Sequence, residues 1–191
     1  KPNCREQQVR YLVVDCAENE LNMLVRDKVF EQSEIMLIPY QGAHDTISPQ
    51  HITSDKKEWV DPDLYSATGG GIPGMHPGFE SDGAGAWRQP GRVRLTSPGG
   101  INVINKIRSV IDRTQHPAGT KLKVFFLCSV AGGTGSGTIV DLVYMTRHVL
   151  ETNFAGLYNN TRIFGYIFSP SACEGGINED RNPGANHYAA M

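Results

Sequence analysis

The chain has 191 residues, of which 39% are hydrophobic and 20% are charged. These values are typical of a soluble globular protein. The formal net charge of −2 at pH 7 gives no reason to expect binding to nucleic acid or to an anionic membrane. No apolar run approaches the roughly 20 residues that a membrane-spanning helix needs, and the start of the chain does not resemble a signal peptide. We therefore expect a cytoplasmic protein without a transmembrane segment.

The cysteines and histidines do not form a metal-binding pattern. The four cysteines, Cys4, Cys16, Cys128 and Cys173, are far apart and include no CxxC pair. The six histidines are scattered and include no HExxH motif. Cys16 and Cys128 lie in or beside apolar, strand-like runs, so we interpret them as small buried hydrophobic residues. No zinc site is predicted.

The first part of the chain predicts two strands separated by a helix. Residues 9–14 are apolar and β-branched, which is typical of a buried strand, and this run ends at Asp15. Residues 20–31 carry apolar positions close to helical spacing, and residues 35–38 form a second strand candidate. From residue 40 to 87 the periodicity disappears and Gly, Pro, Ser and Asp dominate. This stretch predicts a long irregular insertion or loop within the domain.

The second half predicts a strand, a glycine-rich turn, a helix and a further strand. Residues 101–113 first place their apolar positions on one face of a helix. Residues 121–130 form the strongest apolar run, which suits a parallel strand covered on both faces. A glycine-rich run follows directly at 131–137, helical spacing resumes over 138–150, and residues 161–168 form another buried strand. This order is typical of a βαβ unit.

The glycine-rich run, Ala131-Gly-Gly-Thr-Gly-Ser-Gly137, predicts an anion-binding turn. Glycines between a strand and a helix let the backbone turn tightly and expose N–H groups without side chains in the way. The helix dipole adds partial positive charge at the same point, and Thr134, Ser136 and Thr138 add hydroxyl donors. Phosphate therefore suits the turn better than carboxylate. The alternative interpretation is that the glycines only pack a helix on a strand.

Two common phosphate-binding motifs do not match this run. A P-loop requires Gly-Lys-Ser/Thr, whereas Gly137 is followed by Thr138 and the run holds no lysine. The dinucleotide motif GxGxxG is also absent, because Gly133 and Gly135 lead to Thr138 instead of a third glycine. These mismatches disfavour a P-loop enzyme and a Rossmann-type NAD site.

The string Gly-Gly-Thr-Gly-Ser-Gly resembles the phosphate-binding signature of the tubulin/FtsZ superfamily, which follows a strand. The resemblance implies an α/β fold with a three-layer, Rossmann-like parallel sheet, in which residues 1–191 form a nucleotide-binding domain that is incomplete at both ends. The chain is most similar to the divergent bacterial tubulin-like proteins. The residues that this resemblance assigns to the phosphates are Ala131, Gly132, Gly133, Thr134, Gly135, Ser136, Gly137 and Thr138.

Two further stretches agree with the family in order. Gly83, Ala84 and Gly85 resemble the family's loop that closes over the γ-phosphate. The strand that ends at Asp15 is similar to the one whose acidic residues approach Mg²⁺ through water. The family's second acidic position is Ala17 here, so Glu18 beside it is the substitute candidate. The resemblance thus gives Asp15 and Glu18 as metal-site residues.

A third stretch resembles the family's segment around the ribose. Glu174 is then expected to accept a hydrogen bond from a ribose hydroxyl, and Arg181 to contact phosphate or cap the sugar. Asn186 is expected to read the guanine edge because its amide is both donor and acceptor. For each of these residues, a surface charge or a helix cap is the alternative role.

The resemblance also implies elements that this sequence does not contain. In the family a first strand with a Gly-rich loop precedes the strand that ends at Asp15 and lies centrally in the sheet. We therefore expect the sheet of this chain to be split, or completed by another segment or chain. The family's acidic loop, which a neighbouring subunit inserts against the γ-phosphate, would lie beyond residue 191. No catalytic residue is assigned.

The leading hypothesis is a GTP-binding or GDP-binding protein that uses Mg²⁺ and self-assembles into a homo-polymer or filament. Hydrolysis would be completed by the neighbouring subunit. One alternative is a tubulin-like scaffold or interaction module that does not hydrolyse nucleotide, which the Ala17 position and the 40–87 insertion motivate. Another is a Rossmann-like enzyme that uses a different phosphorylated cofactor.

Overall fold

A computed structural model describes residues 8–39, 54, 58–59, 83–84, 88–114, 119–169 and 172. Its strands are β1 (Val13–Asp15), β2 (Ile35–Leu37), β3 (Leu122–Ser129) and β4 (Thr161–Phe168). Its α-helices are α1 (Glu18–Arg26), α4 (Arg88–Thr96), α5 (Ile101–Asp112), α6 (Gly133–Asn153) and α7 (Ala155–Tyr158), with short 3₁₀ turns at Gln32–Glu34 and Pro98–Gly100. The described chain is an α/β protein, as the sequence predicts. The predictions for Gly85, Glu174, Arg181, Asn186 and most of the 40–87 insertion lie outside the described residues.

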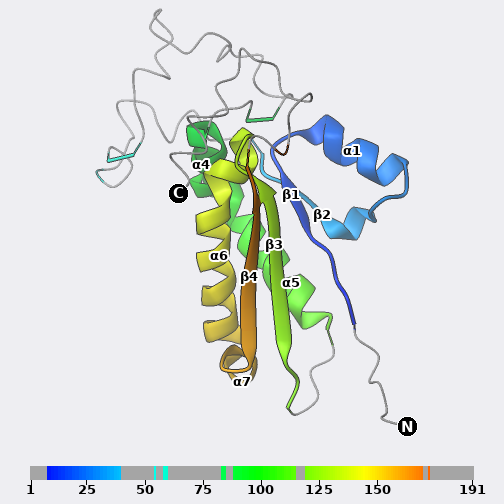
Figure 1. The fold of residues 1–191 in the computed structure, drawn as a ribbon, viewed down its shortest axis with the longest axis vertical. Helices are drawn as coiled ribbons and strands as arrows, with labels where there is room; N and C mark the ends of the chain where they lie inside the picture. Colours follow the sequence, from blue (N-terminus) through cyan, green and yellow to red (C-terminus); the bar gives the residue numbers. More distant parts are fainter. Residues whose placement is uncertain are drawn as a thin grey trace, which may run out of the picture.

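The strands form two separate parallel pairs. β1 pairs with β2, and β3 pairs with β4 from Leu122 opposite Thr161 to Ser129 opposite Phe168. Within the described ranges no ladder joins the two pairs, which agrees with the expected split of the sheet. Figure 1 shows that β1, β3 and β4 end at the same side of the molecule, where α1 and α6 begin. Residues that follow these strands are thereby gathered at one edge.

The core lies between α5, α6 and one face of the β3–β4 pair. Val103, Ile107 and Ile111 of α5 and Val149 and Leu150 of α6 are buried together. The inward side chains of the two strands, which alternate along each strand, complete this layer; they include Leu122, Phe126 and Ile163. α5 and α6 also contact each other directly. This packing joins the C-terminal half of α6 to α5 and to the β3–β4 pair.

The other face of the β3–β4 pair is exposed in the described chain. Phe125 is 49% exposed and Leu127 is 67% exposed on β3, and Phe164 and Tyr166 lie beside them on β4. The rings of Phe125 and Phe164 are stacked with their centroids 5.0 Å apart. The expectation that β3 is covered on both faces therefore holds for one face only.

The largest difference from the predicted elements concerns the start of α6. The sequence predicts a helix from Thr138, because glycine disfavours helical conformation, but α6 already begins at Gly133. The first turn of the helix is thus made from the glycine run itself, with the Ser136 amide donating to the Gly132 carbonyl at 3.2 Å. The sequence pattern does not predict α4 either, because Pro90 and Gly91 obscure its helical periodicity. Pro90 is tolerated in this helix because it lies in the first turn.

The first strand is shorter than the run predicted over residues 9–14, since β1 covers only Val13–Asp15, whereas the other strand boundaries agree to within one residue. The strand at 161–168 coincides with β4, and the helix predicted over 101–113 ends one residue earlier in the structure. α1 is shorter than predicted because it ends at Arg26 and is followed by a 3₁₀ turn. Among the described helices none has the length and apolar character needed to cross a membrane.

Candidate phosphate-binding site

The glycine run lies where β3 passes into α6. Val130, Ala131 and Gly132 connect the end of β3 to the first helical residue, Gly133. The first amides of a helix have no carbonyl partner within the helix, and a helix of 21 residues carries a full dipole. Gly132 is the N-cap and offers no capping side chain. The turn therefore presents partial positive charge and backbone donors to whatever lies in front of it.

Two of the glycines are required by close packing. A Cβ on Gly135 would overlap the carbonyl oxygen of Ser129 on β3, and a Cβ on Gly137 would overlap the carbonyl oxygen of Arg88 on α4. The first turn of α6 is thus held between β3 and α4 at backbone contact. For Gly135 and Gly137 the packing interpretation of the glycine run is correct.

Neither close packing nor backbone conformation requires a glycine at position 132. Its φ of −90° and ψ of 159° are open to any residue, and among the described residues no atom lies within 4 Å of a Cβ built on it. The missing side chain therefore leaves open space directly in front of the first turn. This is the room that an anion needs to approach the helix amides.

The three hydroxyls of the run have partners in this structure. Ser136 Oγ donates to the Gly132 carbonyl at 2.6 Å, and Thr138 Oγ1 donates to the Thr134 carbonyl at 2.7 Å. Both side chains are buried. Thr134 Oγ1 instead points out of the helix and donates to Asp15 Oδ1 at 2.9 Å. Because each hydroxyl has a single proton, the backbone amides are the main donors left for a ligand.

Asp15 is brought to the glycine run although 119 residues separate it from Thr134. Its Oδ1 also accepts from the backbone amides of Cys16 at 2.6 Å and Ala17 at 3.2 Å, so the carboxylate closes the turn after β1. Glu18, the other predicted metal residue, has an exposed side chain in the first turn of α1. Over the described ranges, no group of three or more His, Cys, Asp or Glu residues is arranged to hold a metal ion.

The predicted γ-phosphate loop is described at Gly83 and Ala84. Gly83 has a φ of +83°, a conformation that favours glycine, and a Cβ on it would lie 3.2 Å from the Cβ of Ala17. Ala84 is 2% exposed. These two residues therefore pack on the turn that follows β1, next to the glycine run. Ala17 is itself buried, so the family's second acidic position holds a small apolar side chain that lies beside Gly83.

α4 contributes two arginines to this edge that the sequence patterns do not predict. Arg92 forms an ion pair with Asp141 of α6 at 2.9 Å, and its guanidinium lies 4.4 Å from the ring centroid of Trp59. Arg94 is 1% exposed and donates from Nη1 to the Cys16 carbonyl at 3.0 Å. No sequence signal distinguishes a buried arginine from an exposed one, since burial of Arg94 depends on contacts 78 residues away.

Titration of the groups around this edge follows from burial and neighbouring charge. Burial raises the pKa of the Cys16 thiol, whereas the Thr134 hydrogen bond and the Arg94 charge lower it. Burial also lowers the pKa of Arg88, and the like charge of Arg92 adds to that effect while Asp141 opposes it. The thiol of Cys16 therefore stays protonated at neutral pH.

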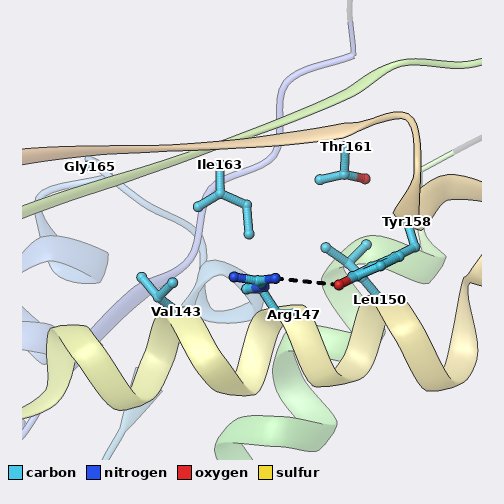
Figure 2. Close-up of a pocket in the computed structure, with 7 residues that line it drawn as sticks. All are labelled: Val143, Arg147, Leu150, Tyr158, Thr161, Ile163 and Gly165. Carbon is cyan, nitrogen blue, oxygen red and sulfur yellow. Dashed lines mark hydrogen bonds between the residues drawn. The ribbon is translucent and has the colours of Figure 1, made fainter.

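A separate cavity of about 540 Å³ lies between α6 and β4. Figure 2 shows Arg147 within it, donating from Nη2 to Tyr158 Oη at 3.4 Å. Arg147 follows Gly133 by fourteen positions, which is roughly 20 Å along the helix at 1.5 Å per residue. This cavity is therefore distinct from the glycine run. Its lining residues are Val143, Arg147, Leu150, Tyr158, Thr161, Ile163 and Gly165.

Fold and site together define an α/β protein with a glycine-rich strand-to-helix turn at the carboxyl end of a parallel strand. A protein-family model described as tubulin-like matches residues 2–191. The chain therefore belongs to the tubulin-like family. Comparison with curated proteins and with solved structures gave no match.

Proposed function

We propose that this chain binds a guanine nucleotide, GTP or GDP, with its phosphates on the first turn of α6. Membership of the tubulin-like family supports both the nucleotide and the assembly of copies into a polymer or filament. The observation that carries the location is Gly132, whose missing side chain is required by neither backbone conformation nor packing. Phosphate oxygens in that space would accept from the helix amides.

The surrounding residues suit a phosphate chain that extends from α6 toward β1. The 131–138 run would hold the phosphates, and Gly83 lies beside Ala17 in the turn after β1, with Ala84 following it. Asp15 is held at the run through Thr134, so its carboxylate would hold a hydrated Mg²⁺, with Glu18 as the second candidate. A bound Mg²⁺ supplies neutralisation of phosphate charge.

Hydrolysis is proposed to require a second copy. We assign no catalytic base in this chain, and the family resemblance places the acidic loop on the neighbouring subunit. Assembly would then bring a carboxylate to the γ-phosphate and orient the attacking water. On this proposal GTP turnover rises with protein concentration, since it follows contact between subunits.

A second function is favoured by the surroundings of Ala17. Ala17 is buried beside Gly83, so the second acidic position of the family is filled by a small, buried apolar residue. A tubulin-like scaffold that binds nucleotide without hydrolysing it fits this arrangement. Incubation of the full-length protein with GTP at assembling concentrations separates the two functions: release of phosphate supports the GTPase, and unchanged GTP supports the scaffold.

The binding proposal is tested by Gly132→Val. A valine is compatible with the extended conformation at this position and would fill only the space in front of the helix. GTP affinity with Mg²⁺, measured by calorimetry, should fall at least about 100-fold while the melting temperature stays unchanged, since a blocked phosphate loses several charge-assisted hydrogen bonds. Gly133→Val and Gly135→Val are less specific, because position 135 contacts the β3 backbone.

The matched control is Gly165→Val. Gly165 is also extended and open, but it lies in β4 beside the separate cavity. This variant should bind GTP like the wild type. Wild-type affinity in Gly132→Val would contradict a phosphate at the start of α6.

A further inference from the structure

We infer that Arg94 is a positioning residue for the proposed phosphate site: it fixes the turn after β1, so that the Asp15 carboxylate holds the Thr134 hydroxyl in the glycine run. This inference rests on the proposed nucleotide function for its consequence, but its structural part applies to the protein without ligand. It concerns the side chain of Arg94 in α4, to which neither the glycine run nor the family resemblance assigns a role.

Arg94 is buried at a high cost. Its side chain is 1% exposed and is the largest of the fully buried side chains in the described ranges. Taking a guanidinium out of water costs several kcal/mol unless hydrogen bonds and opposite charge compensate. Its Nη1 donates to the carbonyl oxygen of Cys16 at 3.0 Å. A cation is therefore placed at the turn that follows β1, where a neutral side chain would cost less to bury.

A chain of hydrogen bonds begins at this turn and ends on α6. Arg94 holds the Cys16 carbonyl, while the amides of Cys16 and Ala17 donate to Asp15 Oδ1. The same oxygen accepts the Thr134 hydroxyl. Three donors thus converge on one carboxylate oxygen, two from the turn and one from α6. Movement of the turn would therefore move Asp15 away from Thr134.

The same groups also surround one side chain, the thiol of Cys16. Burial is the main cause that raises the pKa of this thiol. Asp15 raises the pKa as well, whereas Thr134 and Arg94 lower it. Arg94 donates to the Cys16 carbonyl, and Asp15 accepts from the Cys16 amide and from Thr134, so residues of α4, β1 and α6 meet beside Cys16.

α4 is seated directly on the glycine run. A Cβ on Gly91 would lie 2.5 Å from the carbonyl oxygen of Gly133, so the α4 backbone touches the first turn of α6. Arg94 follows Gly91 by three residues, which is about one helical turn. α4 thus contacts the glycine run through its backbone and the turn after β1 through Arg94, and it fixes the distance between them.

The test is a double-mutant cycle on the affinity of the full chain for GTP with Mg²⁺. Arg94→Met and Thr134→Val should each weaken binding roughly 10-fold, the effect of losing one hydrogen bond to a charged group. If Arg94 acts through Asp15 and Thr134, the double variant should also lose only about 10-fold. A loss near 100-fold, the product of the single effects, would overturn the inference.

Two further variants serve as controls for this cycle. Arg92→Met removes a neighbouring arginine of α4 whose guanidinium pairs with Asp141 of α6, and it should leave GTP affinity unchanged. Arg94→Lys keeps the buried charge and one donor but not the planar guanidinium. Its GTP affinity should fall about 3-fold, again only when Thr134 is present. Arg94→Lys replaces Arg94→Met in the cycle if the methionine variant does not fold.

Amide hydrogen exchange of the protein without ligand tests the structural part by itself. Arg94→Met should speed exchange at the Cys16 and Ala17 amides at least about 10-fold, as opening of the turn exposes them, and leave Val149 in the middle of the core unchanged. Unchanged exchange at Cys16 and Ala17 would overturn the inference even if GTP binds. Failure of the wild type to bind GTP, with exchange altered as expected, would instead overturn the proposed function alone.

Discussion

The two ends of α6 meet their neighbours in different ways. At the first turn, glycines let the helix touch β3 and α4 backbone to backbone, and the polar groups left at the surface are mainly amides. Near the other end, long side chains separate α6 from β4 and leave a cavity of about 540 Å³ with Arg147 in it. Glycines at the first turn of α6 therefore permit close backbone contact, whereas Gly165 of β4, beside the cavity, lies next to open space.

Packing and binding are separate roles within the one glycine motif. Gly135 and Gly137 are explained by contact with neighbouring backbone, whereas Gly132 and Gly165 have open space where a side chain would be. Gly132 differs from Gly165 in lying directly before helix amides that carry the positive end of the α6 dipole. Open space becomes a candidate site only when donors face it, and the proposal for Gly132 depends on that difference.

The largest effect is expected for Gly135→Val. The new side chain would overlap the Ser129 carbonyl, and neither β3 nor α6 can move without disturbing the core between them. We expect a loss of about 3 kcal/mol or more in the free energy of unfolding, at the upper end of overpacking effects. Urea denaturation followed by circular dichroism measures it. A stability equal to that of the wild type would show that α6 does not touch β3 as described.

A smaller loss of stability is expected for Arg92→Met, which removes the ion pair between α4 and α6. Arg92 and Asp141 have side chains that are 32% and 21% exposed, so solvent screens their attraction in part. Together with the stacking of Arg92 on Trp59, the change should cost about 1 kcal/mol. Thermal unfolding at low and high salt checks this: the difference between wild type and variant should shrink with salt. A difference independent of salt would contradict the ion pair.

Sequence patterns could predict β4, α5 and the βαβ order because these elements depend on local periodicity. The family resemblance also predicts a split sheet, which the two separate strand pairs of the described ranges match; the anion site at the glycine run stays a prediction. The start of α6 could not be predicted, because tertiary contacts with β3 and α4 override the low helix propensity of glycine. Nor could the burial of Arg94, which depends on a carbonyl 78 residues earlier.

Gly165→Val should raise the free energy of unfolding, whereas Gly135→Val should lower it. Gly165 lies in β4 on the cavity side, and no atom of the part of the chain that the structure describes lies within 4 Å of a Cβ added to it. Valine favours the extended conformation and would cover part of the cavity wall, so we expect a gain of about 0.5 kcal/mol in the free energy of unfolding. Chemical denaturation measures the shift. A loss above about 1 kcal/mol would mean that the space beside Gly165 is already filled.

The smallest effect is expected for Arg147→Met at the cavity end of α6. The guanidinium is exposed, and its bond to the Tyr158 hydroxyl is long at 3.4 Å, so water replaces the interaction at little cost. The midpoint of thermal unfolding should not change measurably, and GTP affinity should equal that of the wild type because the residue lies roughly 20 Å from the first turn of α6. A fall in affinity would connect the cavity to the glycine run. It would then show that the two ends of α6 do not act independently, and that the space between α6 and β4 transmits changes to the proposed site.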